Sequence, residues 1–141
     1  MLTQAFLPHM RAQHFGRIIN VVFIHSIIAS PFKSARVSAK HGLPGFPKTM
    51  ALETRDVVTV INPLCFACIK TPLVKKQIAV QVIENNMSEA NVVTKIMLEP
   101  MPKKALIEIE ALAQTVHFLI DPAAENITGQ TLILDGDWTA R

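Results

Sequence analysis

The stretch Gly16-Arg17-Ile18-Ile19-Asn20-Val21-Val22-Phe23 decides the fold class of this 141-residue chain. A run with so many β-branched apolar residues is typical of a strand that is covered on both faces, as strands of parallel sheets are. Before this run, apolar residues between positions 2 and 10 recur at helical spacing, and Gly16 is expected to end that helix. A helix followed by a buried strand indicates an α/β fold.

The same alternation continues after the first strand. Ser34 is the predicted N-cap of a helix that runs toward Glu53, because serine accepts a hydrogen bond from an unpaired amide of the first turn. Pro44 and Pro47 each remove a backbone donor and clash with the preceding turn. This helix should therefore kink or break near the two prolines.

Two more strands complete the predicted sheet. The second covers residues 56–64, includes Val58 and should end at Pro63, while the third lies between the turn glycines Gly129 and Gly136. Three further helices are predicted over residues 73–84 after Thr71-Pro72, over 88–98 with Ser88 as the cap, and over 105–119. We therefore predict one α/β domain over residues 1–141, with about three parallel strands and flanking helices.

The composition excludes several classes of function. Hydrophobic residues make up 50% and charged residues 18% of the chain, so an oligomer interface is expected. The net charge of +3 comes from scattered side chains without a basic cluster, which argues against nucleic-acid binding. No segment reaches the about 18 apolar residues of a membrane span, and the first residues do not resemble a secretory signal. We expect a cytoplasmic protein without a membrane partner.

Cys65-Phe66-Ala67-Cys68 is a C-x-x-C motif between a predicted strand and a predicted helix. Such a motif can be a redox pair or half of a zinc site. A structural zinc site needs two more ligands, and the sequence has no second C-x-x-C or histidine pair. A redox pair needs a lowered thiol pKa at a helix start, which here comes several residues later. Buried cysteines at a strand end are the favoured interpretation, and no metal site is predicted.

Five ordered blocks of sequence carry a family resemblance that spans nearly the whole chain. They are Phe15-Gly16-Arg17-Ile18-Ile19-Asn20, Lys33-Ser34-Ala35 with Ala39-Lys40-His41-Gly42, Ala51-Leu52-Glu53-Thr54, Thr71-Pro72-Leu73-Val74, and Ile127-Thr128-Gly129 through Asp135-Gly136 to Trp138-Thr139-Ala140. With these blocks the chain resembles the short-chain dehydrogenases, and among them the bacterial-type D-3-hydroxybutyrate dehydrogenases. The resemblance implies a doubly wound, Rossmann-like parallel sheet and NAD as the cofactor.

The resemblance covers only the C-terminal half of that fold. In the family, a Gly-rich turn lets the pyrophosphate of the dinucleotide approach the backbone. The five glycines of this sequence are nowhere spaced like such a turn. We therefore expect a truncated domain that lacks the Gly-rich nucleotide-binding half, which weakens the expectation that this chain binds NAD by itself.

The resemblance also assigns three catalytic positions. In the family, a tyrosine is the general acid/base, a lysine one helical turn later lowers its pKa and holds the cofactor ribose, and a serine binds the substrate carbonyl. Lys40 matches the lysine, but Arg36 stands at the tyrosine position and Phe23 at the serine position. An arginine stays protonated near neutrality, and a phenylalanine has no hydrogen to donate. The resemblance thus implies an oxidoreductase that is catalytically impaired.

Four further residues match substrate-binding positions of the family. They are His25, Lys33, Gln77 and Trp138, with Lys33 pairing the substrate carboxylate. From the residues alone, Lys33 and Lys40 are ordinary surface lysines, His25 is a hydrogen-bonded loop histidine, and Trp138 is an aromatic residue packed on the core. Both interpretations stay open from the sequence.

Three functions remain open from the sequence. The first is a homologue of NAD-dependent D-3-hydroxybutyrate dehydrogenase, which interconverts 3-hydroxybutyrate and acetoacetate, with impaired catalysis in this chain. The second is a non-catalytic partner that forms homo-oligomers or joins an intact sister subunit and modulates it. The third is a fragment without function. The ligand that the resemblance implies is a small hydroxy acid or keto acid.

Overall fold

The computed structural model describes residues 2–57 and 59–140, so Val58 of the predicted second strand lies outside the described residues. The described strands are β1 (Gly16–Phe23), β2 (Thr59–Phe66) and β3 (Leu132–Leu134). They form one parallel sheet in the order β1-β2-β3. The predicted α/β class with a small parallel sheet is confirmed.

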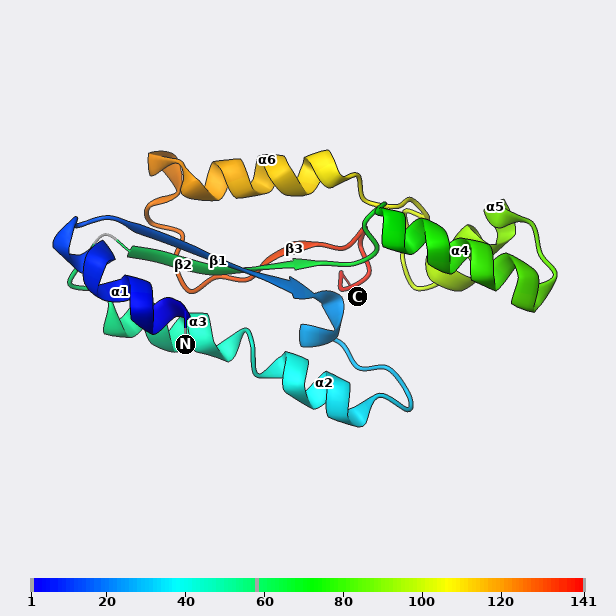
Figure 1. Ribbon diagram of the computed structural model, residues 1–141, viewed down its shortest axis with the longest axis horizontal. Helices are drawn as coiled ribbons and strands as arrows, with labels where there is room; N and C mark the ends of the chain where they lie inside the picture. Colours follow the sequence, from blue (N-terminus) through cyan, green and yellow to red (C-terminus); the bar gives the residue numbers. More distant parts are fainter. Residues whose placement is uncertain (1, 58, 141) are drawn as a thin grey trace.

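The helices cover both faces of this sheet. α1 (Leu2–Ala12), α2 (Ser34–His41) and α3 (Gly45–Glu53) lie on one side, and α6 (Ile109–Ile120) lies on the other (Figure 1). α4 (Pro72–Asn85) and α5 (Glu89–Val92) lie beyond the carboxyl ends of the strands (Figure 1). The sheet is thus the middle of three layers, with an additional helical group at the end to which its strands point.

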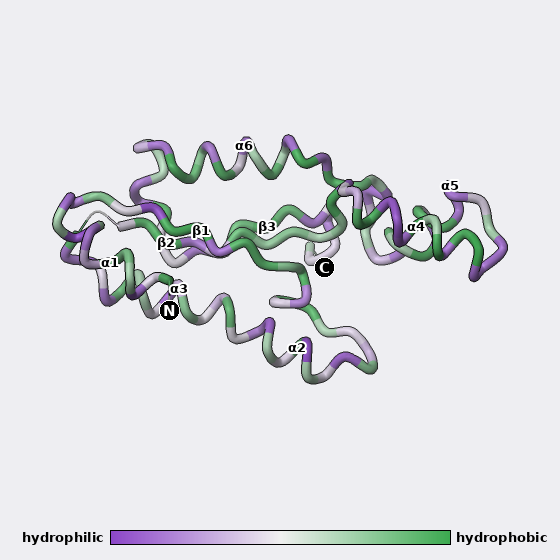
Figure 2. The backbone as a smooth tube through the Cα atoms, in the orientation of Figure 1, coloured by the Kyte–Doolittle hydropathy of each residue, from purple (hydrophilic) through white to green (hydrophobic). Residues whose placement is uncertain are grey.

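The central strand is the most buried element of the chain. Gly16 lies opposite Thr59 and Phe23 opposite Phe66, so β1 and β2 pair along their whole length. Seven of the eight residues of β2 are buried, as expected for a strand with helices on both faces. Figure 2 shows the resulting hydropathy pattern, with hydrophobic segments along the strands and alternating polarity along α6.

Pro63 lies in the middle of β2, which corrects the prediction that it ends the strand. The backbone N–H and C=O groups of successive residues in a strand point to opposite neighbouring strands. The backbone nitrogen of Pro63 therefore points to the same side of β2 as that of Ile61. On this side, the backbone N–H of Gly129 donates to the carbonyl oxygen of Ile61 (2.8 Å). The backbone N–H of Ile61 donates to Thr128 Oγ1 (3.2 Å). β3 begins only opposite Leu64, so no regular ladder bond is required from the nitrogen of Pro63.

α2 and α3 are two helices, which confirms the predicted interruption before the prolines. The predicted cap is wrong, since Lys33 is the N-cap of α2 and Ser34 is the first helical residue. Lys33 makes no side-chain capping bond. The helix thus begins one residue earlier than predicted. Its N-cap directly follows Phe32, which adopts a left-handed φ of 61°.

Ser88 is the N-cap of α5, as predicted, and Thr71 is the N-cap of α4. The hydroxyls of Thr71 and Ser88 accept from backbone N–H groups three residues on, at 3.3 Å and 3.4 Å. The helix after Ser88 is less regular than expected, because α5 passes into a π-helical segment, η2 (Val93–Met97).

Two other helix boundaries differ from the predictions. α6 begins at Ile109 and not at 105, because Ile107 pairs with Ile69 in an isolated parallel bridge. α1 ends at Ala12, so Gly16 opens β1 and does not end the helix. A Cβ at Gly16 would lie 2.8 Å from Met10 Sδ, so the glycine lets α1 pack closely on β1.

The main core cluster lies at the carboxyl ends of the strands. Its buried members are Val22, Ile24, Cys65, Ala67, Leu98 and Met101. Phe23 and Trp138 are partly buried and pack against it. Within residues 2–57 and 59–140, no helix is long and apolar enough to cross a membrane.

Candidate functional site at the carboxyl ends of the strands

A cavity of about 470 Å³ lies where β1 and β2 end. Phe23 and Phe66, the last residues of the two strands, form part of its wall, with ring centroids 6.0 Å apart at 76°. In open α/β sheets, ligands bind in the crevice outside the carboxyl ends of the strands. The cavity is therefore the candidate functional site.

Arg36 and Phe23 form a cation–π pair at this cavity. Cζ of Arg36, on α2, lies over the ring of Phe23 at 5.9 Å from its centroid, and both residues line the cavity. This is within the range of about 6 Å at which a guanidinium is attracted to an aromatic face. The two residues to which the resemblance assigns the tyrosine and serine positions therefore interact with each other.

His25 lies in the turn η1 (Ile24–Ser26), where its ring contacts that of Phe23 without lining the cavity. Its ring centroid is 5.0 Å from that of Phe23, and its Nε2 is 2.8 Å from Ser30 Oγ. Nδ1 is buried without a hydrogen-bond partner among the described residues. Burial lowers the pKa of His25, and the positive charges of Lys33, Arg36 and His41 lower it further. His25 is thus held in its neutral form.

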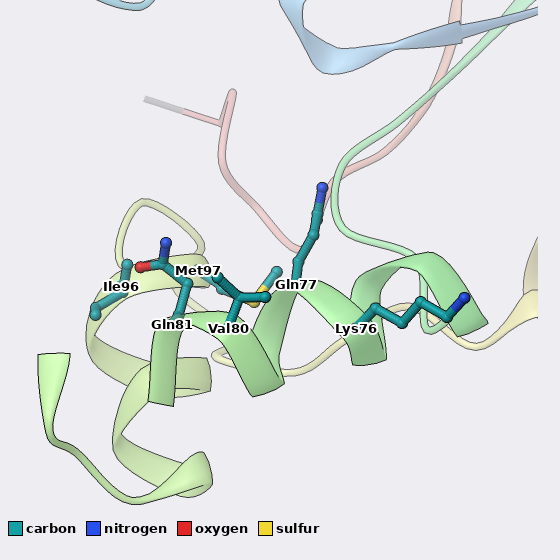
Figure 3. A pocket seen from close by; sticks show the side chains of 6 residues that line it. All are labelled: Lys76, Gln77, Val80, Gln81, Ile96 and Met97. Carbon is teal, nitrogen blue, oxygen red and sulfur yellow. The ribbon is translucent and has the colours of Figure 1, made fainter. Parts of the chain in front are cut away.

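Gln77 lies between this cavity and a second one. It lines the strand-end cavity together with Arg36 and Phe23. It also lines a cavity of about 470 Å³ between α4 and η2. The six residues of this second cavity are Lys76, Gln77, Val80, Gln81, Ile96 and Met97 (Figure 3). In Figure 3, the side chain of Gln77 extends away from Ile96 and Gln81.

The other predicted site residues lie elsewhere. Lys33 is exposed directly before α2, and Lys40 is partly exposed in its last turn. Trp138 packs against the core cluster. In the part of the chain that the structure describes, the cavity wall includes Phe23, Arg36 and Gln77 but not these three residues. The roles that the resemblance assigns to all seven residues stay predictions.

The sequence interpretation missed part of the cavity wall. Thr71 was interpreted only as part of the start of a helix, yet it also lines the cavity. Met97 of η2 and Ile109 and Leu112 of α6 complete the wall from two further elements. An apolar residue of an amphipathic helix carries no local signal that distinguishes a cavity wall from an ordinary core position.

The two cysteines have different surroundings, but the pKa of both thiols is raised. Cys65 is buried, and its Sγ lies 3.6 Å from Ser26 Oγ. Cys68 is half-buried and lines the cavity, and its Sγ lies 3.7 Å from the carbonyl oxygen of Met97. Both are free thiols, and burial raises the pKa of each. A raised pKa opposes the redox interpretation, since the thiolate is the reactive form. The described residues contain no group of three metal-ligating side chains.

The polar groups of the cavity can bind a ligand but are poor at proton transfer. They belong to Arg36, Thr71, Gln77 and Cys68, and the rest of the wall is apolar. A guanidinium, a hydroxyl and an amide do not exchange protons readily near neutral pH. The thiol of Cys68 is held protonated by its raised pKa. The wall therefore offers hydrogen bonds and a positive charge, without a general acid/base.

The fold agrees with the comparisons to known proteins. The family model described as "Enoyl-(Acyl carrier protein) reductase" matches residues 1–139. The chain belongs to this family of short-chain dehydrogenases/reductases, which confirms the resemblance stated from the sequence.

Two curated relatives are D-beta-hydroxybutyrate dehydrogenases. The one from Rhizobium meliloti (strain 1021) is 41% identical over 135 residues, which cover 96% of this chain and 52% of that protein. The one from Cupriavidus necator is 35% identical over 139 residues, which cover 99% of this chain and 54% of that protein. The chain spans about half the length of the curated relatives it matches.

Solved structures show the same partial coverage. "ElxO with NADP Bound" superposes with a TM-score of 0.82 at 25% identity, covering 99% of this chain and 52% of that one. A putative 2-deoxy-d-gluconate 3-dehydrogenase from Agrobacterium tumefaciens with bound NADP gives 0.81 at 26% identity, covering 99% and 53%. These matches confirm the Rossmann-like fold class and connect the family with nicotinamide cofactors.

The residues of this chain fit such a cofactor only in part. The apolar wall of the cavity suits a planar ring, but a pyrophosphate needs backbone N–H groups exposed at a glycine turn. The described glycines with positive φ, Gly129 and Gly136, lie on turns filled by protein atoms. A Cβ there would lie 3.4 Å from Ala51 Cβ or 2.7 Å from Met101 Cε. The described residues therefore provide no pyrophosphate cradle, and no reaction step through the cofactor is derived for this chain.

Proposed function

We propose that the chain is a homologue of NAD-dependent D-3-hydroxybutyrate dehydrogenase in which the proton-transfer step is lost. The observation that carries the proposal is the cation–π pair of Arg36 and Phe23, with 5.9 Å between guanidinium carbon and ring centroid. The proposal treats the chain as one domain that corresponds to the matched part of its relatives. It assigns the protein to the cytoplasm, where the free thiols of Cys65 and Cys68 would stay reduced.

The interconversion of a 3-hydroxy acid and a 3-keto acid requires a proton to leave or to reach the oxygen at C3. Arg36 retains its protons near neutral pH, and Phe23 has no hydrogen to donate to that oxygen. Loss of a general acid/base costs about 10²–10⁴-fold in rate, and loss of a hydrogen-bond donor to the developing oxyanion costs about 10²–10³-fold. From both losses together, we expect this chain to bind a ligand without measurable turnover.

The proposal keeps binding roles for the remaining residues. Lys40 retains the position that holds the cofactor ribose, and Lys33 would pair the carboxylate of a small hydroxy or keto acid. His25, Gln77 and Trp138 would contact the same acid. In support, Gln77 shares the cavity with Arg36, and the ring of His25 packs at 5.0 Å from that of Phe23.

A second candidate function is that of a non-catalytic partner, as a homo-oligomer or beside an intact sister subunit. In its support, β1 is an edge strand of the described sheet, and Val21 on it is 56% exposed. Leu2 and Phe6 of α1 are exposed as well. Several exposed large apolar residues on neighbouring elements are typical of an interaction surface.

One experiment tests both candidates. The purified chain is assayed for NADH formation from NAD and D-3-hydroxybutyrate, beside the dehydrogenase from Rhizobium meliloti, and the two proteins are then mixed and passed through a sizing column. We expect no turnover above background from the chain alone. Turnover within about a hundredfold of the intact enzyme would contradict the loss of proton transfer. Separate elution and an unchanged activity of the enzyme would contradict the partner role.

A further inference from the structure

Positive charge is concentrated in the first part of the chain. Residues 1–52 contain six lysines and arginines and no aspartate or glutamate, and the first acidic residue of the sequence is Glu53. α1, α2 and nearly all of α3 belong to this part, and they form one layer on the sheet (Figure 1). This layer, from which α2 reaches the strand-end cavity, therefore favours anions.

One positive charge lies at the cavity itself. Arg36 is the only charged residue of the described cavity wall, which contains no acidic side chain. Arg36 has no salt bridge among the described residues and interacts with the ring of Phe23. A cation–π contact with an aromatic face uses none of the N–H groups of a guanidinium as hydrogen-bond donors to a polar partner, so they stay available to an oxyanion.

Most of the remaining wall is apolar, and the cavity is larger than a small acid requires. Apolar side chains come from both strands, from α4 and from α6: Val21, Phe23, Phe66, Ala67, Ile69, Leu73, Val74, Ile109 and Leu112. At about 30 Å³ for each atom of the size of a water molecule, a cavity of 470 Å³ holds about fifteen non-hydrogen atoms. A four-carbon hydroxy acid would fill about half of it.

We propose that this cavity binds a medium-chain carboxylate of about eight to ten carbons, whose carboxylate pairs with Arg36 and whose alkyl chain lies along the apolar wall. Gln77 and Thr71 line the same cavity and can donate further hydrogen bonds to the carboxylate. The ligand is bound without being converted, since no group of the wall exchanges a proton at neutral pH. The inference uses the site of the proposed function but does not depend on a dehydrogenase origin.

The surroundings of His25 agree with this preference. His25 packs on Phe23 from behind, and its pKa is lowered by burial and then by Lys33, Arg36 and His41. Three separate cationic groups thus raise the electrostatic potential beside the cavity. A hydrogen bond between a guanidinium and a carboxylate is charge-assisted, and a positive potential around it favours the anion.

The test is isothermal titration calorimetry of the full chain, without nucleotide, against decanoate, decanol and decylamine below their micelle concentrations. We expect decanoate to bind with one site per chain, at least about tenfold more tightly than decanol, and decylamine not to bind. Shortening the acid from decanoate to octanoate should weaken binding about threefold to fourfold for each methylene removed.

Two variants with a matched control assign the site. Arg36→Gln should weaken decanoate binding at least about tenfold and leave decanol unchanged, and Arg36→Lys should lie in between. Lys75→Gln removes an exposed positive charge of α4 that does not line the cavity, and should change nothing. Circular dichroism confirms in each case that the variant is folded.

Three results would overturn the inference. The first is no decanoate binding to the folded wild-type chain. The second is equal affinity for decanoate and decanol in the wild type, a comparison that does not depend on any variant. The third is equal weakening by Arg36→Gln and Lys75→Gln, which would indicate unspecific attraction to positive charge. A failure of dehydrogenase activity, in contrast, has no bearing on these measurements.

Discussion

Asn62 and Gln130 are joined by a hydrogen bond that spans 68 positions of sequence, in which the backbone N–H of Gln130 donates to Oδ1 of Asn62 at 3.0 Å. The side-chain nitrogen of Asn62 donates to the carbonyl of Ile127. Asn62 lies in β2 and is fully buried. One buried amide thus anchors both ends of the irregular segment that leads into β3.

Replacing this amide should destabilise the whole sheet. Asn62→Leu leaves the N–H of Gln130 and the carbonyl of Ile127 without their partner. Both hydrogen bonds are part-buried, so each unpaired group costs about 1–2 kcal/mol, in the lower part of the range for buried groups. We expect urea denaturation to give a free energy of unfolding about 2–4 kcal/mol lower. The control is Asn126→Leu, an exposed asparagine of the same region, which should change it by less than about 0.5 kcal/mol. A cost below that value for Asn62→Leu would mean that β3 is anchored otherwise.

The fully buried Leu64 tests the contribution of the central strand. Leu64→Ala removes apolar contacts and leaves a cavity between the helical layers, which costs about 2–5 kcal/mol. Ile83→Ala on α4 is the matched control, because Ile83 is 82% exposed and should cost less than about 1 kcal/mol. Equal midpoints in thermal unfolding of the two variants would contradict the burial of β2.

His25 should make stability depend on pH. Its pKa in the folded chain lies below 6.5, while in the unfolded chain it has that ordinary value. As pH falls below about 6.5, the unfolded chain takes up a proton that the folded chain does not, so the free energy of unfolding falls. The contribution is complete above the unfolded pKa and is lost as pH falls toward the folded pKa.

Two measurements check this dependence. Nuclear magnetic resonance titration should give His25 a pKa below 6.5, and Lys33→Gln should raise it, because one of the positive charges beside the ring is removed. His25→Gln should flatten the pH dependence of the unfolding free energy between pH 5 and pH 7, roughly the range of the histidine titration. A His25 pKa above 6.5 would show that the ring is not desolvated in solution.

Restoring the two family residues should not restore turnover. The double variant Phe23→Ser with Arg36→Tyr replaces the cation–π pair by the hydroxyl groups of the family, yet the described glycines provide no pyrophosphate cradle. We expect no NADH formation from NAD and D-3-hydroxybutyrate above the background of the unmodified chain. NADH formation by this double variant would show that the chain holds the cofactor in a way that its glycines do not reveal.

The thiols should react slowly. Burial raises the pKa of Cys65 and Cys68, which lowers the thiolate fraction at neutral pH. We expect iodoacetamide at pH 7 to modify both residues more slowly in the folded chain than in urea, and Cys65 more slowly than Cys68 because it is more deeply buried. Mass spectrometry of digests gives the two rates. Rapid modification of Cys65 in the folded chain would point to local opening of the strand ends.

Local sequence patterns predicted the helices and strands, whereas tertiary contacts determined the residues at which they begin and end. The β-branched run that includes Val21, the helix start at Thr71-Pro72 and the hydroxyl cap at Ser88 are local signals, and the structure bears them out. Pro63 could not be placed from the sequence, because its tolerance depends on an irregular segment more than sixty positions away. The start of α6 depends in the same way on the bridge between Ile107 and Ile69.

The candidate site could be predicted only where the chain brings neighbouring elements together. Phe23 ends β1 and Arg36 lies in the first turn of α2, with only the short turn η1 and a loop between them along the chain. Met97 and Leu112 reach the same cavity from distant helices, without a sequence signal that separates them from core residues. Three of the residues that the resemblance singled out, Phe23, Arg36 and Gln77, line the cavity, whereas its volume and apolar character required the structure.

Because β1 is an edge strand, the solubility of this chain should depend on the molar ratio of a strand-forming partner to the chain. In the described sheet, β1 is paired only with β2, so one side of its eight residues can accept another strand. An open edge accepts a complementary segment and an identical copy by the same backbone hydrogen bonds, so the two compete. A partner strand in excess would therefore act on this chain as a dedicated chaperone, and the yield of dispersed protein should rise with the ratio of partner to chain.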